Sequence, residues 1–187
     1  MKNIYFIRHG EATHNVDFKL RGEEAYLDEK HINSVLTTKG INDAIYLKHN
    51  FININKIDLV LVSPLTRAIM TVLNIFDNKK IICIEDLREY PMGIHPVNKR
   101  KKKSELKSIY KDITFSEICE DDIYFNEGNK ESINNLEKRI NNLKYYIKKR
   151  DEQNIAIISH CSFISYFLYS DFKKILHCKP YVFNLFP

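Results

Sequence analysis

The chain has 187 residues, a length that suits one domain with a substantial hydrophobic core. Hydrophobic residues make up 44% and charged residues 28%, as in an ordinary globular protein, and no apolar run approaches the roughly 20 residues that cross a bilayer. The formal net charge of +5 suits an anionic metabolite or a nucleic acid and does not choose between them.

Cysteine usage and the N-terminal sequence bear on location. The four cysteines form no CxxC pair and have no tight metal-like spacing: Cys83, Cys119, Cys161 and Cys178. No signal peptide is evident at Met1, so we expect a cytoplasmic protein with free thiols, no membrane association and no metal site.

Short apolar runs rich in Ile and Val alternate along the chain with longer segments of helical periodicity. The runs predict strands at Asn3–Ile7, Ile57–Val62, Lys80–Ile84 and Asn154–Ser159. The intervening periodicity predicts helices at Thr38–Phe51, Leu65–Phe76, Lys130–Arg150 and Ser162–Tyr169. No repeat, linker or domain boundary interrupts this alternation.

The pattern within these elements predicts how they pack. In the third helix, one stripe carries the apolar residues Ile133, Leu136, Ile140, Leu143 and Ile147, as expected of an amphipathic helix covering a sheet. Uninterrupted apolar strands alternating with helices are typical of a parallel sheet buried on both faces. We therefore predict one α/β domain over residues 1–187, a three-layer sandwich with a mostly parallel sheet and helices on both faces.

Polar and charged side chains follow each predicted strand at its carboxyl end, where parallel α/β sheets bind their ligands. They are Arg8, His9, Glu11, Arg67, Glu85, Asp86, Arg88, Glu89 and His160. An arginine side chain presents a planar fork of donors that matches phosphate oxygens, and it keeps its charge at working pH. This set predicts a pocket for a dianionic group, with phosphate as the first candidate.

The same residues suggest a reaction that needs no metal, because positioning and electrostatics supply most of phosphoryl-transfer catalysis. The imidazole of His9 is a competent nucleophile, and Glu89 could protonate the leaving oxygen and later activate water. This role would require a raised pKa for the Glu89 carboxyl. The other carboxylates at this edge, Glu11, Glu85 and Asp86, are alternative candidates for the role. We expect Gly10 to let the backbone approach the anion and Asn15 to add an amide donor.

The segment Arg8-His9-Gly10, followed by Asn15, resembles the RHG signature of the histidine phosphatase (phosphoglycerate mutase-like) superfamily. Further motifs follow in the family's order: Leu36-Thr37-x-x-Gly40, Ser63-Pro64-x-x-Arg67-Ala68-x-x-Thr71, Leu87-Arg88-Glu89 with Gly93, and Ser159-His160. The resemblance spans nearly the whole chain and implies a phosphoglycerate mutase-like fold without a cofactor. It implies that His9 is phosphorylated, that Glu89 is the acid and base, and that the phosphoryl group is bound by Arg8, Asn15, Arg67 and His160.

Two positions depart from the family pattern. Cys161 stands where Gly is common, and Asn33 stands where the family has Asp. We expect Cys161 to alter donor geometry next to the pocket without abolishing activity. A cysteine-dependent phosphatase with an HCx5R loop is excluded, because Phe167 occupies the position of the arginine.

Substrate specificity is expected in the segment Tyr90–Asp122. The resemblance places its basic run over the pocket, so Lys99 and Arg100 are candidate substrate contacts, together with His95 and Arg21. Nucleic-acid binding would need aromatic residues interleaved with the basic ones, and these are missing. We predict a phosphatase for small-molecule phosphate esters, with phosphoglycerate mutase-type transfer and non-catalytic phospho-ligand binding as alternatives.

Overall fold

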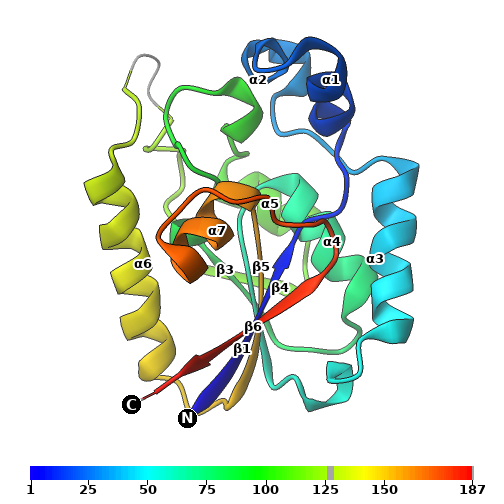
Figure 1. The fold of residues 1–187 in the computed structure, drawn as a ribbon, viewed down its shortest axis with the longest axis vertical. Coiled ribbons are helices and arrows are strands. Elements are labelled where there is room, and N and C mark those ends of the chain that lie inside the picture. Colours follow the sequence, from blue (N-terminus) through cyan, green and yellow to red (C-terminus); the bar gives the residue numbers. More distant parts are fainter. Residues whose placement is uncertain (126–128, 187) are drawn as a thin grey trace.

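The computed structural model of the chain describes residues 1–125 and 129–186. Its centre is a six-stranded sheet in the order β4-β3-β2-β5-β1-β6 (Figure 1). The strands are β1 Lys2–Arg8, β2 Leu59–Val62, β3 Ile81–Ile84, β4 Ile113–Glu117, β5 Asn154–Ser159 and β6 Pro180–Leu185. All neighbouring strands are parallel except β1 and β6, so the sheet is mostly parallel, as the sequence predicts.

Helices cover both faces of this sheet (Figure 1). They are α1 Thr13–Arg21, α2 Glu24–Leu27, α3 Thr38–Asn50, α4 Thr66–Ile75, α5 Lys103–Ile109, α6 Ile133–Lys148 and α7 Cys161–Tyr169. Alternate residues of β1 point to opposite cores: Tyr5 and Ile7 pack with α3 and α4, whereas Ile4 and Phe6 pack with α6 and α7. The predicted three-layer sandwich is confirmed. Within the described residues, none of the helices has the length and apolar character to span a bilayer.

The four predicted strands and four predicted helices all form, with ends within three residues of those expected. Leu136, Ile140, Leu143 and Ile147 of the predicted stripe are buried, whereas Ile133 is 36% exposed at the start of α6. The strands β4 and β6 and the helices α2 and α5 are absent from the elements that the sequence predicts. Both extra strands lie at sheet edges and are partly exposed, so their apolar signal is weaker than that of the central strands.

A close approach of two glycines fixes the loop that follows β1. A Cβ atom on Gly10 would lie 2.5 Å from the carbonyl oxygen of Gly40, and one on Gly40 would lie 2.1 Å from the oxygen of Glu11. The Gly10 amide donates to Thr71 Oγ1 at 3.0 Å. Gly10 therefore lets this loop pack against the start of α3, which differs from the predicted role of bringing its backbone to an anion.

Candidate active site

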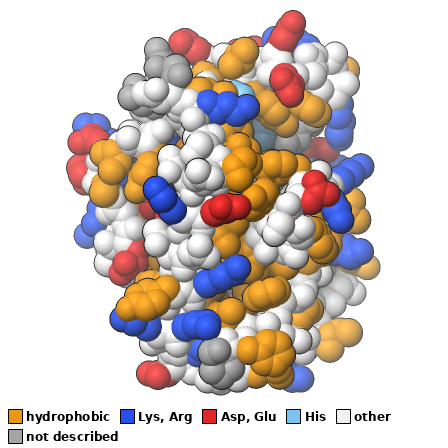
Figure 2. Space-filling view, turned by 60° about the vertical axis from the view of Figure 1, so that its left-hand side comes forward, with side chains coloured by type: hydrophobic (Ala, Val, Ile, Leu, Met, Phe, Trp, Pro, Cys, Tyr) orange, Lys and Arg blue, Asp and Glu red, His pale blue; other side chains and the backbone are white. Residues whose placement is uncertain are grey.

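A cleft of about 960 Å³ opens at the carboxyl edge of the parallel strands. Figure 2 shows histidine side chains at the bottom of a hollow bordered by hydrophobic and basic side chains. Six of the predicted site residues line this cleft: Arg8, His9, Asn15, Arg67, Glu89 and His95. His160 is fully buried, with its ring centroid 5.0 Å from that of His9. The strand ends thus deliver these groups to one place.

His9 is 2% exposed, and its backbone amide donates to Ser159 O at 3.0 Å, between the ends of β1 and β5. Its Nδ1 lies 2.7 Å from the carbonyl oxygen of Gly10. Because a carbonyl only accepts, Nδ1 must carry the proton, and the neutral ring then has its lone pair on Nε2. Burial, followed by the charge of Arg67, holds the His9 pKa well below its ordinary value, so the ring is neutral near pH 7.

Three buried side-chain nitrogens near His9 have no hydrogen-bond partner in the described protein, namely Arg8 Nε, Arg67 Nε and His160 Nδ1; Arg88 Nε and Thr66 Oγ1, which do not line the cleft, have none either. Other guanidinium nitrogens hold the two side chains in place: Arg8 Nη1 donates to Ile175 O at 2.8 Å, Arg67 Nη1 to Val97 O at 2.9 Å and Arg67 Nη2 to Asn98 Oδ1 at 2.8 Å. A buried polar group without a partner costs about 1–3 kcal/mol. An anion with several acceptor oxygens would relieve this cost at all three positions.

The charge and protonation of these groups suit an anionic ligand. Burial lowers the Arg67 pKa to about 10, which leaves its guanidinium charged at neutral pH. His160 Nε2 lies 2.7 Å from Ser63 Oγ, which also accepts from the Leu65 amide at 3.4 Å. If the Ser63 hydroxyl donates to Nε2, the neutral ring carries its proton on Nδ1. Burial and then Arg67 lower the His160 pKa, which favours this neutral form.

The Asn15 side chain is engaged at both ends. Its Oδ1 accepts from the Ala12 amide at 3.0 Å, and its Nδ2 donates to His14 Nε2 at 2.9 Å. His14 Nδ1 in turn donates to Ser34 Oγ at 2.6 Å. One N–H of the amide is left without a partner in these contacts, so Asn15 keeps one donor while it orients His14.

Glu89 is held at the start of α7 by backbone amides. Its Oε1 accepts from the amides of Tyr90 at 2.9 Å, Ser162 at 3.0 Å and Phe163 at 3.2 Å. Two of these are free N–H groups of the first helical turn, where a carboxylate is favoured. Cys161 also lines the cleft at this helix start, and the amides that follow it serve Glu89.

Two of the rival carboxylates, Glu85 and Glu11, have basic side chains as partners. Glu85 accepts from Arg88 at 3.0 Å and from Arg100 at 3.0 and 3.1 Å, in a buried network away from the cleft. Glu11 lines the cleft but pairs with Lys19 at 2.7 Å. Of the three carboxylates that line the cleft, Glu23 and Glu89 form no ion pair with a basic side chain in the described part of the chain, and Glu89 is the less exposed of these two.

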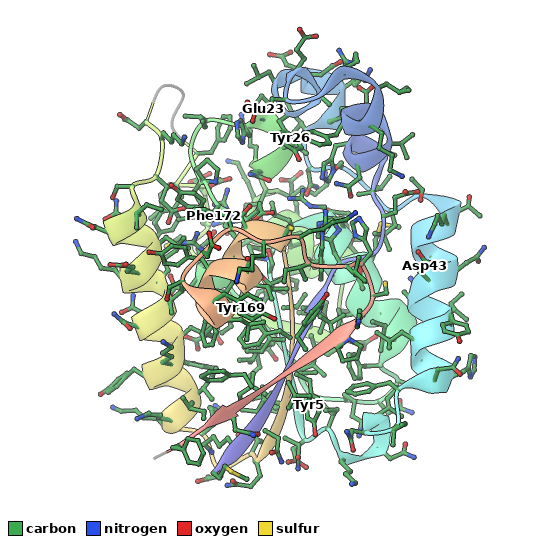
Figure 3. The ribbon with its side chains drawn as sticks, viewed as in Figure 1. Tyr5, Glu23, Tyr26, Asp43, Tyr169 and Phe172 are labelled. Carbon is green, nitrogen blue, oxygen red and sulfur yellow. The ribbon has the colours of Figure 1, made fainter. Side chains whose placement is uncertain are left out.

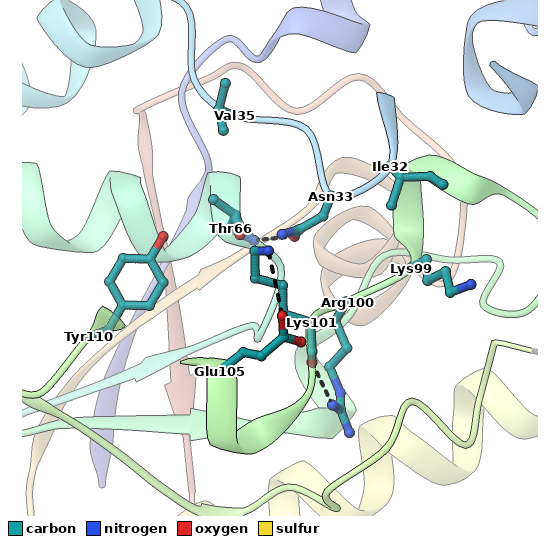
Figure 4. Close-up of a pocket in the computed structure, with 9 residues that line it drawn as sticks. All are labelled: Ile32, Asn33, Val35, Thr66, Lys99, Arg100, Lys101, Glu105 and Tyr110. Atoms are coloured by element: carbon teal, nitrogen blue, oxygen red, sulfur yellow. Dashed lines mark hydrogen bonds and ion pairs between the residues drawn. The ribbon is translucent and has the colours of Figure 1, made fainter. Parts of the chain in front are cut away.

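Three candidate substrate contacts lie outside this cleft. Arg100 is buried, and its guanidinium donates to Glu85 and to four backbone carbonyls, so the fold uses its donors. Arg21 pairs with Asp17 and Asp28 at the end of α1. Lys99 lies 4.9 Å over the Phe125 ring. Both Lys99 and Arg100 border a separate pocket of about 500 Å³, in which the Arg100 guanidinium points away from Asn33 and Thr66 (Figure 4).

Two further histidines, which the sequence analysis did not select, complete a cluster around His9. Ring centroids lie 5.5 Å away for His177 and 6.0 Å away for His14. His177 Nδ1 donates to the His9 carbonyl at 2.6 Å. His14 directly precedes Asn15 and was available to sequence reasoning, whereas nothing in the sequence marks His177. Within the part of the chain that the structure describes, no group of His, Cys, Asp and Glu side chains is arranged to hold a metal ion.

Comparisons with known proteins identify the family and the fold of the chain. The sequence model of the histidine phosphatase superfamily (branch 1) matches residues 4–175. A phosphoglycerate mutase-like protein of Arabidopsis thaliana is 27% identical over 207 aligned positions, which cover 92% of this chain and 75% of that protein.

Solved structures share the fold as well. The alpha-ribazole phosphatase of Shigella flexneri superposes with a TM-score of 0.61 at 25% identity, over 90% of this chain and 78% of that one. The phosphoserine phosphatase of Entamoeba histolytica, solved with 3-phosphoglyceric acid, has a TM-score of 0.63 at 20% identity, over 98% and 91% of the two chains, and shows the fold alone. The chain belongs to branch 1 of the histidine phosphatase superfamily.

Proposed function

We propose that this protein is a phosphatase that hydrolyses small phosphate monoesters through a phosphohistidine at His9, without a metal ion. The observation that carries the proposal is the set of three buried, unpartnered donors next to an unprotonated imidazole nitrogen. Those donors suit phosphate oxygens, and the nitrogen suits attack on phosphorus.

The reaction takes place in two steps. The lone pair of His9 Nε2 forms a bond to phosphorus while the bond from phosphorus to the ester oxygen breaks, and Glu89 gives its proton to the departing alkoxide. Water then attacks the phosphohistidine, Glu89 takes a proton from it, and the bond between nitrogen and phosphorus breaks. Arg8, Arg67 and His160 hold the phosphoryl oxygens in both steps, so charge on the transferred group is neutralised by fixed donors.

The position of Glu89 supports its part as the base of the second step, because its three amide partners favour the carboxylate, and for the first step it must take up a proton when the dianionic ester binds. The carboxylate lines the same cleft as His9, and backbone amides fix it without a competing basic side chain. A group that transfers protons must be held within reach of the leaving oxygen, and a rigid helix start serves that purpose.

Relatives with phosphatase names favour hydrolysis, whereas three relatives of Arabidopsis thaliana carry mutase-like names. A mutase would return the phosphoryl group to a second hydroxyl of the same metabolite. A binder without turnover would use the same donors but would release no phosphate.

A phosphate-release panel in excess EDTA separates these functions. It would include p-nitrophenyl phosphate, phosphoserine, phosphoglycerates, sugar phosphates, nucleotides and a phosphotyrosine peptide. We compare the wild type with His9→Ala and with His49→Ala, a control at an exposed histidine near the end of α3. Release by the wild type and the control, with none from His9→Ala, is the expected result.

Other outcomes would overturn parts of the proposal. Activity that persists in His9→Ala would remove the nucleophile assignment, and loss of activity in EDTA would refute metal independence. Phosphorus NMR of the products would reveal a mutase by a moved phosphoryl group. An acid-labile, alkali-stable phosphoryl label on the wild type and its absence from His9→Ala would identify phosphohistidine directly.

A further inference from the structure

The cleft is much larger than a phosphoryl group needs. Pockets of about 300–1,000 Å³ enclose whole drug-sized ligands, and this cleft has about 960 Å³. The phosphate-binding donors occupy only its base, around His9. The remaining space is available for the alcohol portion of the ester. The side chains that line this part of the cleft therefore indicate which kind of alcohol it accommodates.

One wall is aromatic and belongs to the helices above the sheet edge. Phe18 of α1 and Tyr26 of α2 stack, with centroids 4.9 Å apart and planes 17° apart. His95 extends the wall, with its ring centroid 5.4 Å from that of Tyr26. All three residues line the cleft, and Phe18 is 38% exposed.

A second aromatic wall comes from the sheet side of the cleft. Tyr90 stacks on Phe172, with centroids 5.2 Å apart and planes 14° apart. Phe172 and Leu176 belong to the strap, residues 171–178 between α7 and β6, and they are 48% and 46% exposed. Figure 3 places Tyr26 above and Phe172 below, and both line the same cleft.

Exposed apolar surface that gathers in a concave site marks a place for an apolar ligand group. Aromatic faces and edges favour flat partners, because stacked and edge-to-face ring pairs add to the gain from burial alone. A small charged alcohol such as serine or glycerate would leave both walls in contact with water.

We propose that the cleft recognises a phosphate monoester whose alcohol carries a planar ring, which packs against the walls formed by Phe18, Tyr26 and His95 on one side and Tyr90 and Phe172 on the other. The proposal rests on the function proposed above, because it assigns the phosphate to the donors around His9. The strap, through Phe172, and α2, through Tyr26, then determine which esters are good substrates.

A series of alkyl esters with matched leaving groups tests the proposal. We compare kcat/KM for 2-(2-naphthyl)ethyl phosphate, 2-cyclohexylethyl phosphate and ethyl phosphate, whose alcohols are similarly poor leaving groups. The naphthyl ester is expected to be the best substrate. In Tyr26→Leu and in Phe172→Leu, the ratio of naphthyl to ethyl kcat/KM should fall by about two- to tenfold, the range of a lost aromatic pair. The same change at the exposed Tyr145 of α6 should leave this ratio unchanged.

Binding of the matching phosphonates, measured by calorimetry, reports on the ring without requiring turnover. Tighter binding of the naphthyl compound than of the cyclohexyl and ethyl compounds would support the ring site even if no ester were hydrolysed. Equal binding of the naphthyl and cyclohexyl compounds, or ratios unaffected by Tyr26→Leu and Phe172→Leu, would overturn it. Naphthyl-selective binding without phosphate release from any ester would instead count against the proposed function alone.

Discussion

Replacing Glu89 by Gln is expected to reduce kcat/KM strongly for esters whose leaving oxygen needs a proton and only slightly for esters whose leaving oxygen does not. In the wild type, Oε1 accepts from three backbone amides at 2.9, 3.0 and 3.2 Å. The amide oxygen of Gln can accept the same three bonds, so the side chain should keep its place. What the variant loses is the carboxyl proton itself, and the effect on rate therefore reports on proton transfer.

The size of the effect follows from the leaving group. Losing a general acid costs about 10²–10⁴-fold in rate for an alkyl ester, which is about 3–5 kcal/mol of barrier at about 1.4 kcal/mol per tenfold. The p-nitrophenolate ion departs without a proton, so the rate of phosphoryl transfer from p-nitrophenyl phosphate to His9 should change little. The ratio of the two rates cancels any general loss of folded protein.

The assay compares kcat/KM for ethyl phosphate and p-nitrophenyl phosphate in excess EDTA. The control is Glu137→Gln, at an exposed carboxylate on α6. Equal losses on both esters in Glu89→Gln would show that the side chain acts in binding or structure, and the acid assignment would be wrong. A loss confined to the alkyl ester in Glu11→Gln would assign the proton to that rival carboxylate.

Two further predictions concern stability. Arg100→Ala should lower the free energy of unfolding by about 1–3 kcal/mol, because the buried Glu85 carboxylate loses one of its two arginine partners and keeps Arg88. The exposed ion pairs of Arg21 contribute far less, so thermal denaturation of Arg100→Ala and Arg21→Ala should differ clearly, and similar midpoints would contradict the buried network. The His177 pKa is lowered from 6.5 to about 4 by burial first and Arg8 second. The unfolded chain binds this proton more readily than the folded protein does. The contribution of His177 to the free energy of unfolding should therefore be at its full value above about pH 6.5 and should fall between about pH 6.5 and 4. Urea midpoints should show that decline and a smaller one in His177→Gln, and an identical pH dependence of the two proteins would contradict it.

The central strands β2 and β3 could be predicted from the sequence because every residue in them is buried and apolar. Leu59–Val62 and Ile81–Ile84 are buried at all positions and read as continuous apolar runs. The edge strand Ile113–Glu117 alternates with exposed positions, and in Pro180–Leu185 only Leu185 is buried. A partly exposed edge strand carries a weaker apolar signal, and both were missed for this reason.

The site divides in a similar way. Arg8, His9 and Glu89 could be predicted because each follows a recognisable strand and belongs to a motif. The roles of Arg100 and His177 depend on contacts that are distant in sequence: Arg100 with the carbonyls of residues 119–121, and His177 with a carbonyl 168 positions away. A basic residue buried in such a network has the same sequence signature as one on a solvated loop.

In the proposed mechanism, the arrangement around His9 would solve an electrostatic problem of nucleophilic phosphoryl transfer. The nucleophile must be a neutral imidazole, yet the phosphoryl group it attacks is a dianion that tends to protonate nearby bases. Burial lowers the His9 pKa most, and the positive charges of Arg67 and Arg8 lower it further while their guanidinium groups would offer donors to the phosphate oxygens. Because one pair of cations serves both purposes, replacing either would weaken phosphate binding and make His9 easier to protonate. In the proposed mechanism, the two arginines would therefore act on the nucleophile as well as on the substrate.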